Sequence, residues 1–348
     1  MHCMAKKKMR STPNIEPSEM TLYLATANTL PNTTTTSFID LSECAALMNR
    51  RFYRQGLNWA VAGFKILTAQ PTGGQSIIGT IQCKKLPSTW VFKNAWTKGM
   101  KHWQERLNEA VGEDGEDVKG RFLDFKIYAD SDHHDAGFTA NLRPRSGDGT
   151  LAIPGEYLSA KIRLKTGTGG SVAHEVVGVG DNYPGVSTAT SLNAVSLVHG
   201  YAASRALPSE SDPNTPDDLD SVAGTLAQNW MTALTNNKDG GNADAFIVED
   251  VSGYDLPPYP FENDGSVVDT HYPGGANQLP SLMLHDTASY GGTTIGGSTY
   301  LKGGNFPCGL IRIDHTVNTE SVAHNIVIQV DLVPGNHRGY LAEPMGDM

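Results

Sequence analysis

Five side chains that could bind a metal ion lie within six residues, from Asp130 to Asp135 (DSDHHD). Carboxylates and imidazoles are suitable ligands for a divalent cation. Ligands adjacent in sequence rarely converge on one ion without more distant partners, however, and neither an HExxH nor an EF-hand pattern accompanies them. We therefore interpret this segment as a solvated acidic loop at the end of a strand. A metal-dependent hydrolase that uses these residues is a remaining alternative.

Other polar combinations lack the parts that known catalytic motifs require. Lys165-Thr166-Gly167 matches one element of penicillin-recognising enzymes, but the sequence contains neither an SxxK nor an SDN element. His285-Asp286 and Asp314-His315 could each join a serine in a triad, although adjacency in sequence gives no information on hydrogen-bond geometry. We interpret both pairs as ordinary polar residues at strand ends, and we predict no enzyme activity and no cofactor.

Basic residues are concentrated in the first third of the chain. Residues 1–110 contain 14 Lys and Arg against 6 Asp and Glu, whereas the remainder contains 13 against 31. Because basic patches attract phosphate, the first third is predicted to contact nucleic acid, although a scatter of solvated cations would give the same composition. Lys84 and Lys85 could extend such a patch. The predicted nucleic-acid-binding residues are Lys6, Lys7, Lys8, Arg10, Arg50, Arg51 and Arg54.

The scaffold for these basic residues is predicted to begin with an arm and a helix. Residues 1–36 are basic and polar with little to bury, which predicts a flexible arm. Residues 40–55 place apolar side chains on one stripe and precede Gly56, which predicts a helix. A second helix is predicted over residues 90–111 from an aromatic stripe that includes Trp96 and Trp103. We interpret this stripe as core packing rather than as a platform for stacked bases.

Strand patterns dominate the rest of the chain. Residues 57–68 and 76–83 flank a Pro-Thr-Gly-Gly turn and predict a hairpin, and residues 158–165 are expected to pair with residues 171–179. Ile326, Ile328, Val330 and Leu332 are expected to face the core from one strand. Further predicted elements are strands at 122–129, 245–251, 282–285, 310–315 and 326–333, and a helix at 215–236 that starts at Thr215-Pro216.

This arrangement favours an all-β fold with a few inserted helices, because strand and helix patterns do not alternate as they do in α/β proteins. We predict an antiparallel jelly-roll β-sandwich that forms a single domain with long inserted loops over residues 37–348. No stretch reaches the roughly 20 apolar residues of a membrane span. No signal peptide is recognisable, so we expect the protein in the cytosol or nucleus. The four cysteines are widely spaced, which predicts buried or free thiols rather than a zinc site or disulfides.

Three segments resemble a known family of structural proteins. They are residues 47–56 (LMNRRFYRQG), residues 96–126 with the Trp96 to Trp103 helix and Arg121-Phe122-Leu123-Asp124-Phe125-Lys126, and the ending at residues 333–345 (VPGNHRGYLAEPM). In these segments the chain is similar to the capsid proteins of small circular Rep-encoding single-stranded DNA (CRESS-DNA) viruses. The likeness is spread across most of the chain and includes no catalytic signature.

The resemblance implies a jelly-roll subunit that assembles with copies of itself into an icosahedral shell around a single-stranded DNA genome. Such a protein would be found in the virion, and in the host nucleus or cytoplasm during assembly, with outer loops that could contact a host receptor. Many relatives have a long Arg-rich arm, whereas the arm here offers only Lys6, Lys7, Lys8 and Arg10. About 60 copies would supply roughly 240 charges against on the order of thousands of phosphates, so inner-surface residues such as Arg50, Arg51 and Arg54 or mobile cations would have to contribute.

A carbohydrate-binding or adhesion module is the main alternative. Such modules also use β-sandwiches with aromatic loops rich in Asp and Asn, and residues 254–259 and 263–272 have that composition. Glycan binding by a discrete monomer would favour this alternative over a shell subunit.

Overall fold

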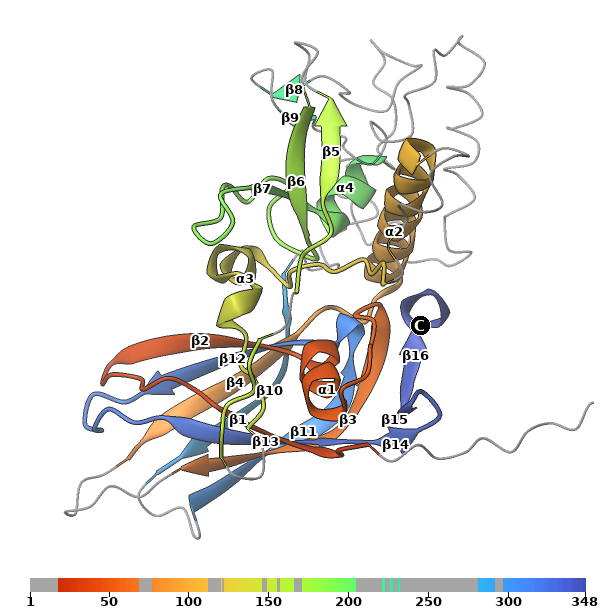
Figure 1. The fold of residues 1–348 in the computed structure, drawn as a ribbon. Helices are drawn as coiled ribbons and strands as arrows, with labels where there is room; N and C mark the ends of the chain where they lie inside the picture. Colours follow the sequence, from red (N-terminus) through yellow and green to blue (C-terminus); the bar gives the residue numbers. More distant parts are fainter. Residues whose placement is uncertain are drawn as a thin grey trace, which may run out of the picture.

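The computed structural model describes residues 18–68, 77–111, 120, 122–145, 149–154, 157–165, 171–204, 221–222, 226–227, 231, 281–291 and 297–348. In this part of the chain, eight long strands form two antiparallel sheets at the lower end of the view in Figure 1, and the short β16 (Ala342–Pro344) adds to the first of them. The first sheet has the order β1 (Thr21–Ala25), β13 (Ile326–Leu332), β3 (Leu57–Thr68), β11 (Ser298–Phe306). The second has the order β10 (Met283–Tyr290), β4 (Gly79–Lys85), β12 (Leu310–Val317), β2 (Thr33–Asp40).

The main hydrophobic core lies between these two sheets. Alternate residues of each strand point inward, as the period of two in a strand requires. Ile328 of the first sheet and Ile313 of the second are fully buried in this core, together with Trp59 and Phe64 of β3. The four predicted inward-facing residues of β13 are all buried, which confirms that part of the sequence interpretation. The prediction of an all-β protein with antiparallel sheets and few helices is also confirmed.

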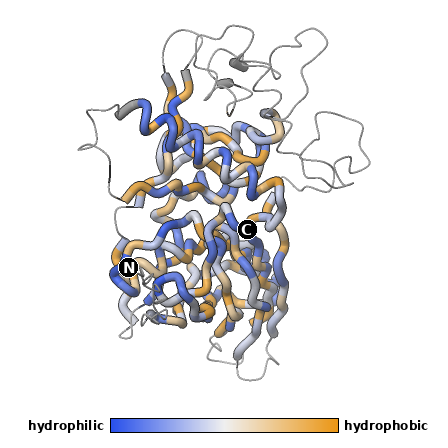
Figure 2. Tube along the Cα trace, turned by 90° about the vertical axis from the view of Figure 1, so that its right-hand side faces the viewer, coloured by the Kyte–Doolittle hydropathy of each residue, from blue (hydrophilic) through white to orange (hydrophobic). Residues whose placement is uncertain are grey.

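A long insert separates β4 from β10 and forms a second layer of structure beside one end of the sandwich (Figure 1). It contains α2 (Trp90–Val111), α3 (Ser131–Ala136), the 3-10 turn η2 (Phe138–Ala140) and α4 (Leu197–Ser204). Its sheet joins β5 (Ile162–Lys165) antiparallel to β6 (Ser171–Val177), and β6 parallel to β7 (Asn193–Ser196). The insert has its own core, where α2 packs on α4, and this core contains Phe92 and Leu197 of the two helices and Val176 of β6. Apolar segments therefore recur in both halves of the molecule (Figure 2).

The C-terminal segment returns to the junction of sandwich and insert. After β13 the chain forms β14 (Pro334–Gly335) and β15 (Gly339–Tyr340), and β16 (Ala342–Pro344) then pairs with the start of β3. The last turn, η7 (Met345–Asp347), contacts α2. A second 3-10 turn, η6 (Pro307–Gly309), links β11 to β12 on the side of Trp59. No helix in the described part of the chain is long and apolar enough to cross a membrane.

The helix α1 (Leu41–Asn49) is shorter than the predicted helix at 40–55. Asp40 caps its N-terminus, because its carboxylate accepts the amide N–H groups of Ser42 and Glu43. Arg50 then adopts a left-handed conformation with φ of 56°, which ends the helix. Residues 51–56 consequently leave the helix axis and run toward α2 and the C-terminal segment.

Several predicted pairings and elements are wrong. The predicted hairpin of residues 57–68 and 76–83 does not form, because β3 and β4 belong to different sheets. Part of the predicted flexible arm at 1–36 forms β1 and the first half of β2, which pair with β13 and β12, whereas residues 1–17 lie outside the described residues. Residues 122–129 form no strand: Tyr128 makes an isolated bridge to Val177, and the carbonyls of Lys126 and Ala129 accept the amides of Ala160 and Val179. Within the predicted helix at 215–236, the described residues instead form the short strands β8 (Ser221–Val222) and β9 (Leu226–Ala227), so the helix is wrong there.

Other predictions agree with the structure or lie outside its described part. β3 and α2 have the predicted bounds, and β5 pairs with β6 as predicted. The strand at 245–251 and the loops at 254–259 and 263–272 lie outside the described residues.

Candidate nucleic-acid interface

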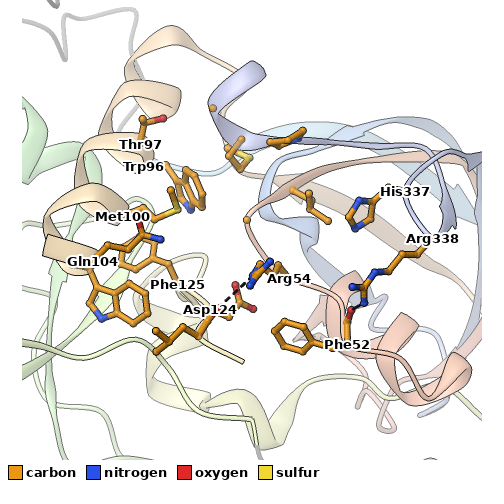
Figure 3. A pocket seen from close by; sticks show the side chains of 17 residues that line it. Phe52, Arg54, Trp96, Thr97, Met100, Gln104, Asp124, Phe125, His337 and Arg338 are labelled. Atoms are coloured by element: carbon orange, nitrogen blue, oxygen red, sulfur yellow. Dashed lines mark hydrogen bonds between the residues drawn. The ribbon is translucent and has the colours of Figure 1, made fainter. Parts of the chain in front are cut away.

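A pocket of about 420 Å³ lies where α2, the segment after α1 and the C-terminal segment meet (Figure 3). This volume is within the range of roughly 300–1,000 Å³ that is usual for small-molecule sites. Its lining is aromatic and apolar inside, with charged and polar side chains toward the opening. The lining includes Phe52, Arg54, Gly56, Trp96, Met100, Trp103, Gln104, Leu123, Asp124, Phe125, His337, Arg338 and Met345.

Backbone geometry brings these distant segments together. The left-handed Arg50 turns the chain so that Phe52 to Gly56 form one wall of the pocket. Gly56 lies close to Trp96, since a Cβ atom at this position would lie 2.5 Å from the Trp96 ring. The amide of Met345 donates to the Gly56 carbonyl at 3.2 Å, which places the C-terminal turn over the same wall.

Aromatic rings form the inner wall. Trp96 and Phe125 are 4% and 3% exposed, and their ring centroids lie 6.0 Å apart in an edge-to-face arrangement. Trp103, about two turns after Trp96 along α2, lies 5.5 Å from Phe125. The indole N–H of Trp96 is buried and has no hydrogen-bond partner among the described residues. An unpaired buried donor is costly for the folded protein.

Two guanidinium groups and one carboxyl group lie nearer the opening. Arg54 stacks over the Phe52 ring at 5.6 Å, and its Nε donates to the Leu123 carbonyl at 3.4 Å. The Arg338 guanidinium donates to the Phe52 carbonyl. Asp124 accepts the Gln55 amide N–H at 3.0 Å, and burial raises the pKa of its carboxyl group to about 6. The side chains of Arg54 and Arg338 are exposed, so their remaining N–H groups face solvent.

Ser18, the first described residue, lies beside this opening. The Ser18 hydroxyl donates to the Arg338 carbonyl at 2.9 Å, and the Arg51 guanidinium donates to the Ser18 hydroxyl at 3.4 Å. Glu19, which follows Ser18, is held by the Tyr340 hydroxyl, which donates to the Glu19 carbonyl at 2.6 Å. The basic cluster of Lys6 to Arg10 lies outside the described residues, but it is joined to the chain at this point.

The structure therefore separates the predicted basic residues. Arg54 lines the pocket. Arg51 does not line it but contacts Ser18 beside its opening, and Arg50 is the exposed residue that caps the C-terminus of α1. Lys84 and Lys85 do not line it, because Lys84 pairs with Asp314 at 2.7 Å and Lys85 donates to the Asn305 carbonyl at 2.7 Å. Sequence reasoning did not single out His337, Arg338 or Asp124. Arg338 and His337 lie in the C-terminal segment of the viral resemblance, which was the only signal that pointed to them.

The Asp130–Asp135 segment is not a solvated loop, so that interpretation is wrong. It forms α3, whose two histidines are buried. His134 contacts the Glu175 carboxylate at 2.9 Å, and His133 contacts the Asn141 side chain at 2.9 Å. Burial lowers the pKa of His133 to about 3, so its ring is neutral. Among the described residues, no three His, Cys, Asp or Glu side chains come together as metal ligands.

The two candidate triad pairs also serve other contacts. Asp314 pairs with Lys84 and Arg312 on the outer face of its sheet, whereas His315 points into the core toward Tyr290. Asp286 accepts the Lys302 amide N–H at 2.8 Å, and His285 contacts the Lys302 carbonyl at 3.0 Å. Neither histidine is therefore oriented by the carboxylate next to it, as a triad would require.

Comparisons with known proteins find no relative. No family model, no curated protein and no solved structure matches the chain. The function therefore has to be argued from the strand order and from the pocket.

Proposed function

We propose that this protein is the subunit of a self-assembling viral shell that encloses single-stranded DNA, and that its sandwich is a jelly roll. The strand order carries this proposal. Numbered along the chain, the eight sandwich strands form sheets of order 1-8-3-6 and 5-4-7-2. Strand 1 pairs with 8, 2 with 7, 3 with 6 and 4 with 5, as in a long antiparallel ribbon. Rolling that ribbon brings strand 8 beside 3 and strand 7 beside 4, and both contacts are present.

Jelly rolls occur in capsids, lectins and cupins, so the strand order needs support from other features. Association with further copies is supported by large apolar side chains on the surface of the subunit. Ile153 and Leu158 are 82% and 73% exposed, and Leu151 lies in the same segment at 41%. A contact with a neighbouring copy would remove these large apolar side chains from water.

The edges of the sandwich support a wall-like subunit. Residues 142–145 cross the open side at β1 and β2, because the Leu142 amide donates to the Phe38 carbonyl and the Arg145 amide to the Tyr23 carbonyl. The opposite edge strands, β10 and β11, present Leu284 and Tyr300, which are 55% and 66% exposed. A covered edge resists uncontrolled strand addition, while the other side remains available to a neighbouring subunit.

A nucleic-acid partner is supported by the pocket and its surroundings. Arg51, Arg54 and Arg338 lie where the basic N-terminal segment joins the sandwich. Guanidinium groups bind phosphate through several N–H donors at once. The proposal places the protein in the virion, and in the host nucleus or cytoplasm during assembly. Its outer loops would contact a host receptor.

Microscopy of the purified full-length protein tests this proposal. Negative-stain images and sedimentation velocity are expected to show closed particles of uniform size. A protein that stays monomeric at all concentrations and salts would overturn the proposal, and glycan binding by such a monomer would favour an adhesion module. Ile153→Asp should prevent particle formation without changing circular dichroism, because the side chain is exposed in the isolated subunit. Ile153→Val is the matched control and should assemble normally.

A further inference from the structure

We propose that the pocket between α2 and the C-terminal segment binds one unpaired nucleobase of a single-stranded nucleic acid, with the adjacent phosphate held by Arg54 and Arg338. This inference rests on the proposed function, because it specifies how the subunit would contact an enclosed single strand. It adds a defined base site to the general attraction between basic residues and phosphate.

The inner wall has the properties of a base-binding surface. Every nucleobase has an apolar π-face, and proteins that bind single strands place aromatic rings against it. Phe52, which is half-buried beside Arg54, offers such a ring, and Trp96 and Phe125, which are 4% and 3% exposed, line the inner wall.

Polar groups at the opening match the rest of a nucleotide. Gln104 of α2 and the carboxyl group of Asp124 can hydrogen-bond to polar atoms on the base edge (Figure 3). Arg54 and Arg338 outnumber this single carboxyl group, and both have exposed side chains. A phosphate next to the bound base would therefore meet a net positive charge, and Arg54 could contact it without losing its stacking on Phe52.

A neighbouring pocket provides a path for the next nucleotides. Trp103 lines both pockets, and the second, of about 540 Å³, also contains Arg106, Lys161 and Arg163. Arg106 contacts Glu109 at 3.3 Å, whereas Lys161 and Arg163 on the β5 side are exposed. A single strand with one base beside Trp96 could thus continue along α2 with its phosphates near cations.

Photo-crosslinking of the full-length protein tests the inference directly. A short oligothymidylate that carries iododeoxyuridine would be bound, irradiated and digested with trypsin together with the protein. Crosslinks are expected in the peptides 94–98 and 122–126, which contain Trp96 and Phe125. Crosslinks confined to residues 1–17 would overturn the inference, as would an apolar ligand that occupies the pocket and is not displaced by the oligonucleotide.

Affinity measurements give a second, independent readout. Arg54→Gln should weaken binding of a fluorescent single strand about tenfold and should reduce the slope of log affinity against log salt by about one. Arg145→Gln is the matched control, since it removes the same charge from an exposed residue that lines neither pocket. Equal effects of the two variants would overturn the inference. Particle formation is measured separately by microscopy. Normal particles without crosslinks in the pocket would refute the base site alone. Crosslinks in the pocket of a strictly monomeric protein would refute the proposed shell alone.

Discussion

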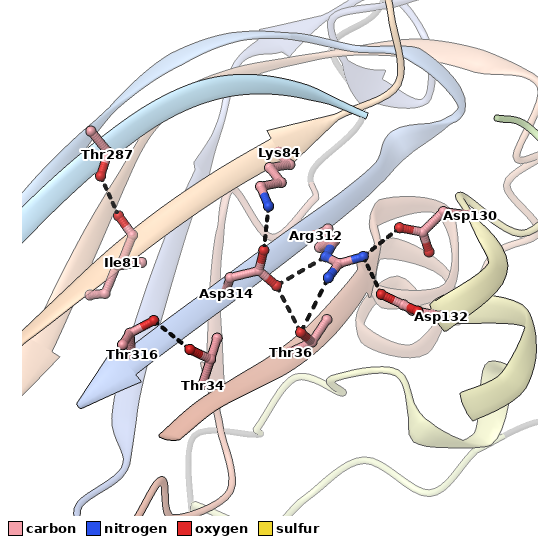
Figure 4. Close-up of polar contacts among 10 residues, drawn as sticks. All are labelled: Thr34, Thr36, Ile81, Lys84, Asp130, Asp132, Thr287, Arg312, Asp314 and Thr316. Atoms are coloured by element: carbon pink, nitrogen blue, oxygen red, sulfur yellow. Dashed lines mark hydrogen bonds and ion pairs between the residues drawn. The ribbon is translucent and has the colours of Figure 1, made fainter. Parts of the chain in front are cut away.

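Arg312 of β12 lies 2.6 Å from the Asp130 carboxylate at the N-terminus of α3, and this ion pair joins the sandwich to the insert (Figure 4). The same guanidinium contacts Asp132 at 2.6 Å and Asp314 at 2.9 Å. The Arg312 side chain is only 17% exposed. Burial raises the pKa of Asp130, although hydrogen bonds from the His133 amide and Arg312 oppose this effect. Arg312 therefore neutralises carboxylates that would otherwise be buried without a counter-ion.

Replacing Arg312 is expected to destabilise the whole subunit. Arg312→Met leaves the carboxylates of Asp130 and Asp314 buried with less compensation, so we expect the free energy of unfolding to fall by about 2–4 kcal/mol. Urea denaturation followed by tryptophan fluorescence measures this change. Asp132→Asn is the control, because the Asp132 side chain is 60% exposed and its loss should cost less than about 1 kcal/mol. Similar effects of the two variants would show that the ion pair at Asp130 does not stabilise the junction.

Local sequence patterns predicted individual elements well but not their partners. The bounds of β3 and α2 follow from a change in the hydrophobic period and from an aromatic stripe, which are properties of consecutive residues. The pairing of β3 with β11 and β13, rather than with β4, depends on contacts between segments far apart in the chain. Local periodicity contains no information on such contacts. β2 was missed because its first residues, in a threonine tract, lie exposed at the edge of a sheet.

The candidate site shows the same division. Arg54 could be selected from the local density of arginines after α1. The sequence could not predict that Arg54 lies in one pocket with Arg338 and Trp96. This pocket requires the left-handed turn at Arg50 and the pairing of β16 with β3. The aromatic stripe of α2 was assigned to the core, and Trp96 is indeed buried, yet its ring also lines the pocket.

A chain of hydrogen bonds at the opposite end of the sandwich predicts sensitivity to acid. The Val322 carbonyl can only accept, so His324 Nδ1 carries a proton and donates it to this carbonyl. The other ring nitrogen, His324 Nε2, accepts the Tyr290 O–H at 2.5 Å. The Tyr290 oxygen then accepts the His315 Nε2–H, also at 2.5 Å. His315 Nδ1 in turn accepts the Thr29 hydroxyl at 2.9 Å. In this arrangement the Thr29 hydroxyl can donate to His315 only while the His315 ring is neutral.

Stability should therefore decrease in acid. Burial, and then the neighbouring His324, lowers the pKa of His315 from 6.5 to about 4. The unfolded chain takes up this proton near pH 6.5 and the folded chain only near pH 4. The contribution of neutral His315 is thus complete above pH 6.5 and is lost as the pH falls toward 4, with a total of about 3 kcal/mol. Urea midpoints measured between pH 8 and pH 4 should show this loss, and a constant midpoint over that range would contradict it.

Tyr290→Phe tests the same chain at constant pH. The variant leaves the His315 N–H and His324 Nε2 without their shared partner, so we expect a loss of about 1–3 kcal/mol in the free energy of unfolding at pH 8. Tyr300→Phe is a matched control, because the Tyr300 side chain is 66% exposed on β11. The control should change stability by less than about 0.5 kcal/mol. If both variants behave alike, the Tyr290 hydroxyl does not link the two histidines.

Glu43 predicts the opposite dependence on pH. Burial, and then the nearby Asp40 carboxylate, raises the pKa of Glu43 from 4.5 to about 7. The stability associated with its neutral form is complete below pH 4.5 and is lost as the pH rises toward 7. Glu43→Gln removes this penalty, and its side-chain carbonyl can still accept the Asn141 N–H that Glu43 accepts at 3.0 Å. We expect the variant to be more stable than the parent by about 1–3 kcal/mol at pH 8 and nearly equal at pH 4.5. A uniform destabilisation at both pH values would contradict this prediction.

Gly303 tests the pairing that places β11 beside β3. The register pairs Lys302 with Gly63 and Gly304 with Val61, and a Cβ atom at Gly303 would lie 2.2 Å from the Ala62 carbonyl oxygen and 2.3 Å from that of Val61. Backbone atoms cannot move away as a flexible side chain can, so Gly303→Ala should lower the free energy of unfolding by at least about 2 kcal/mol. At Gly291 a Cβ atom would meet nothing within 4 Å, so Gly291→Ala should stay within about 0.5 kcal/mol of the parent protein. Equal stability of the two variants would show that β11 and β3 are not paired in this register, and the strand order on which the jelly roll rests would have to be revised.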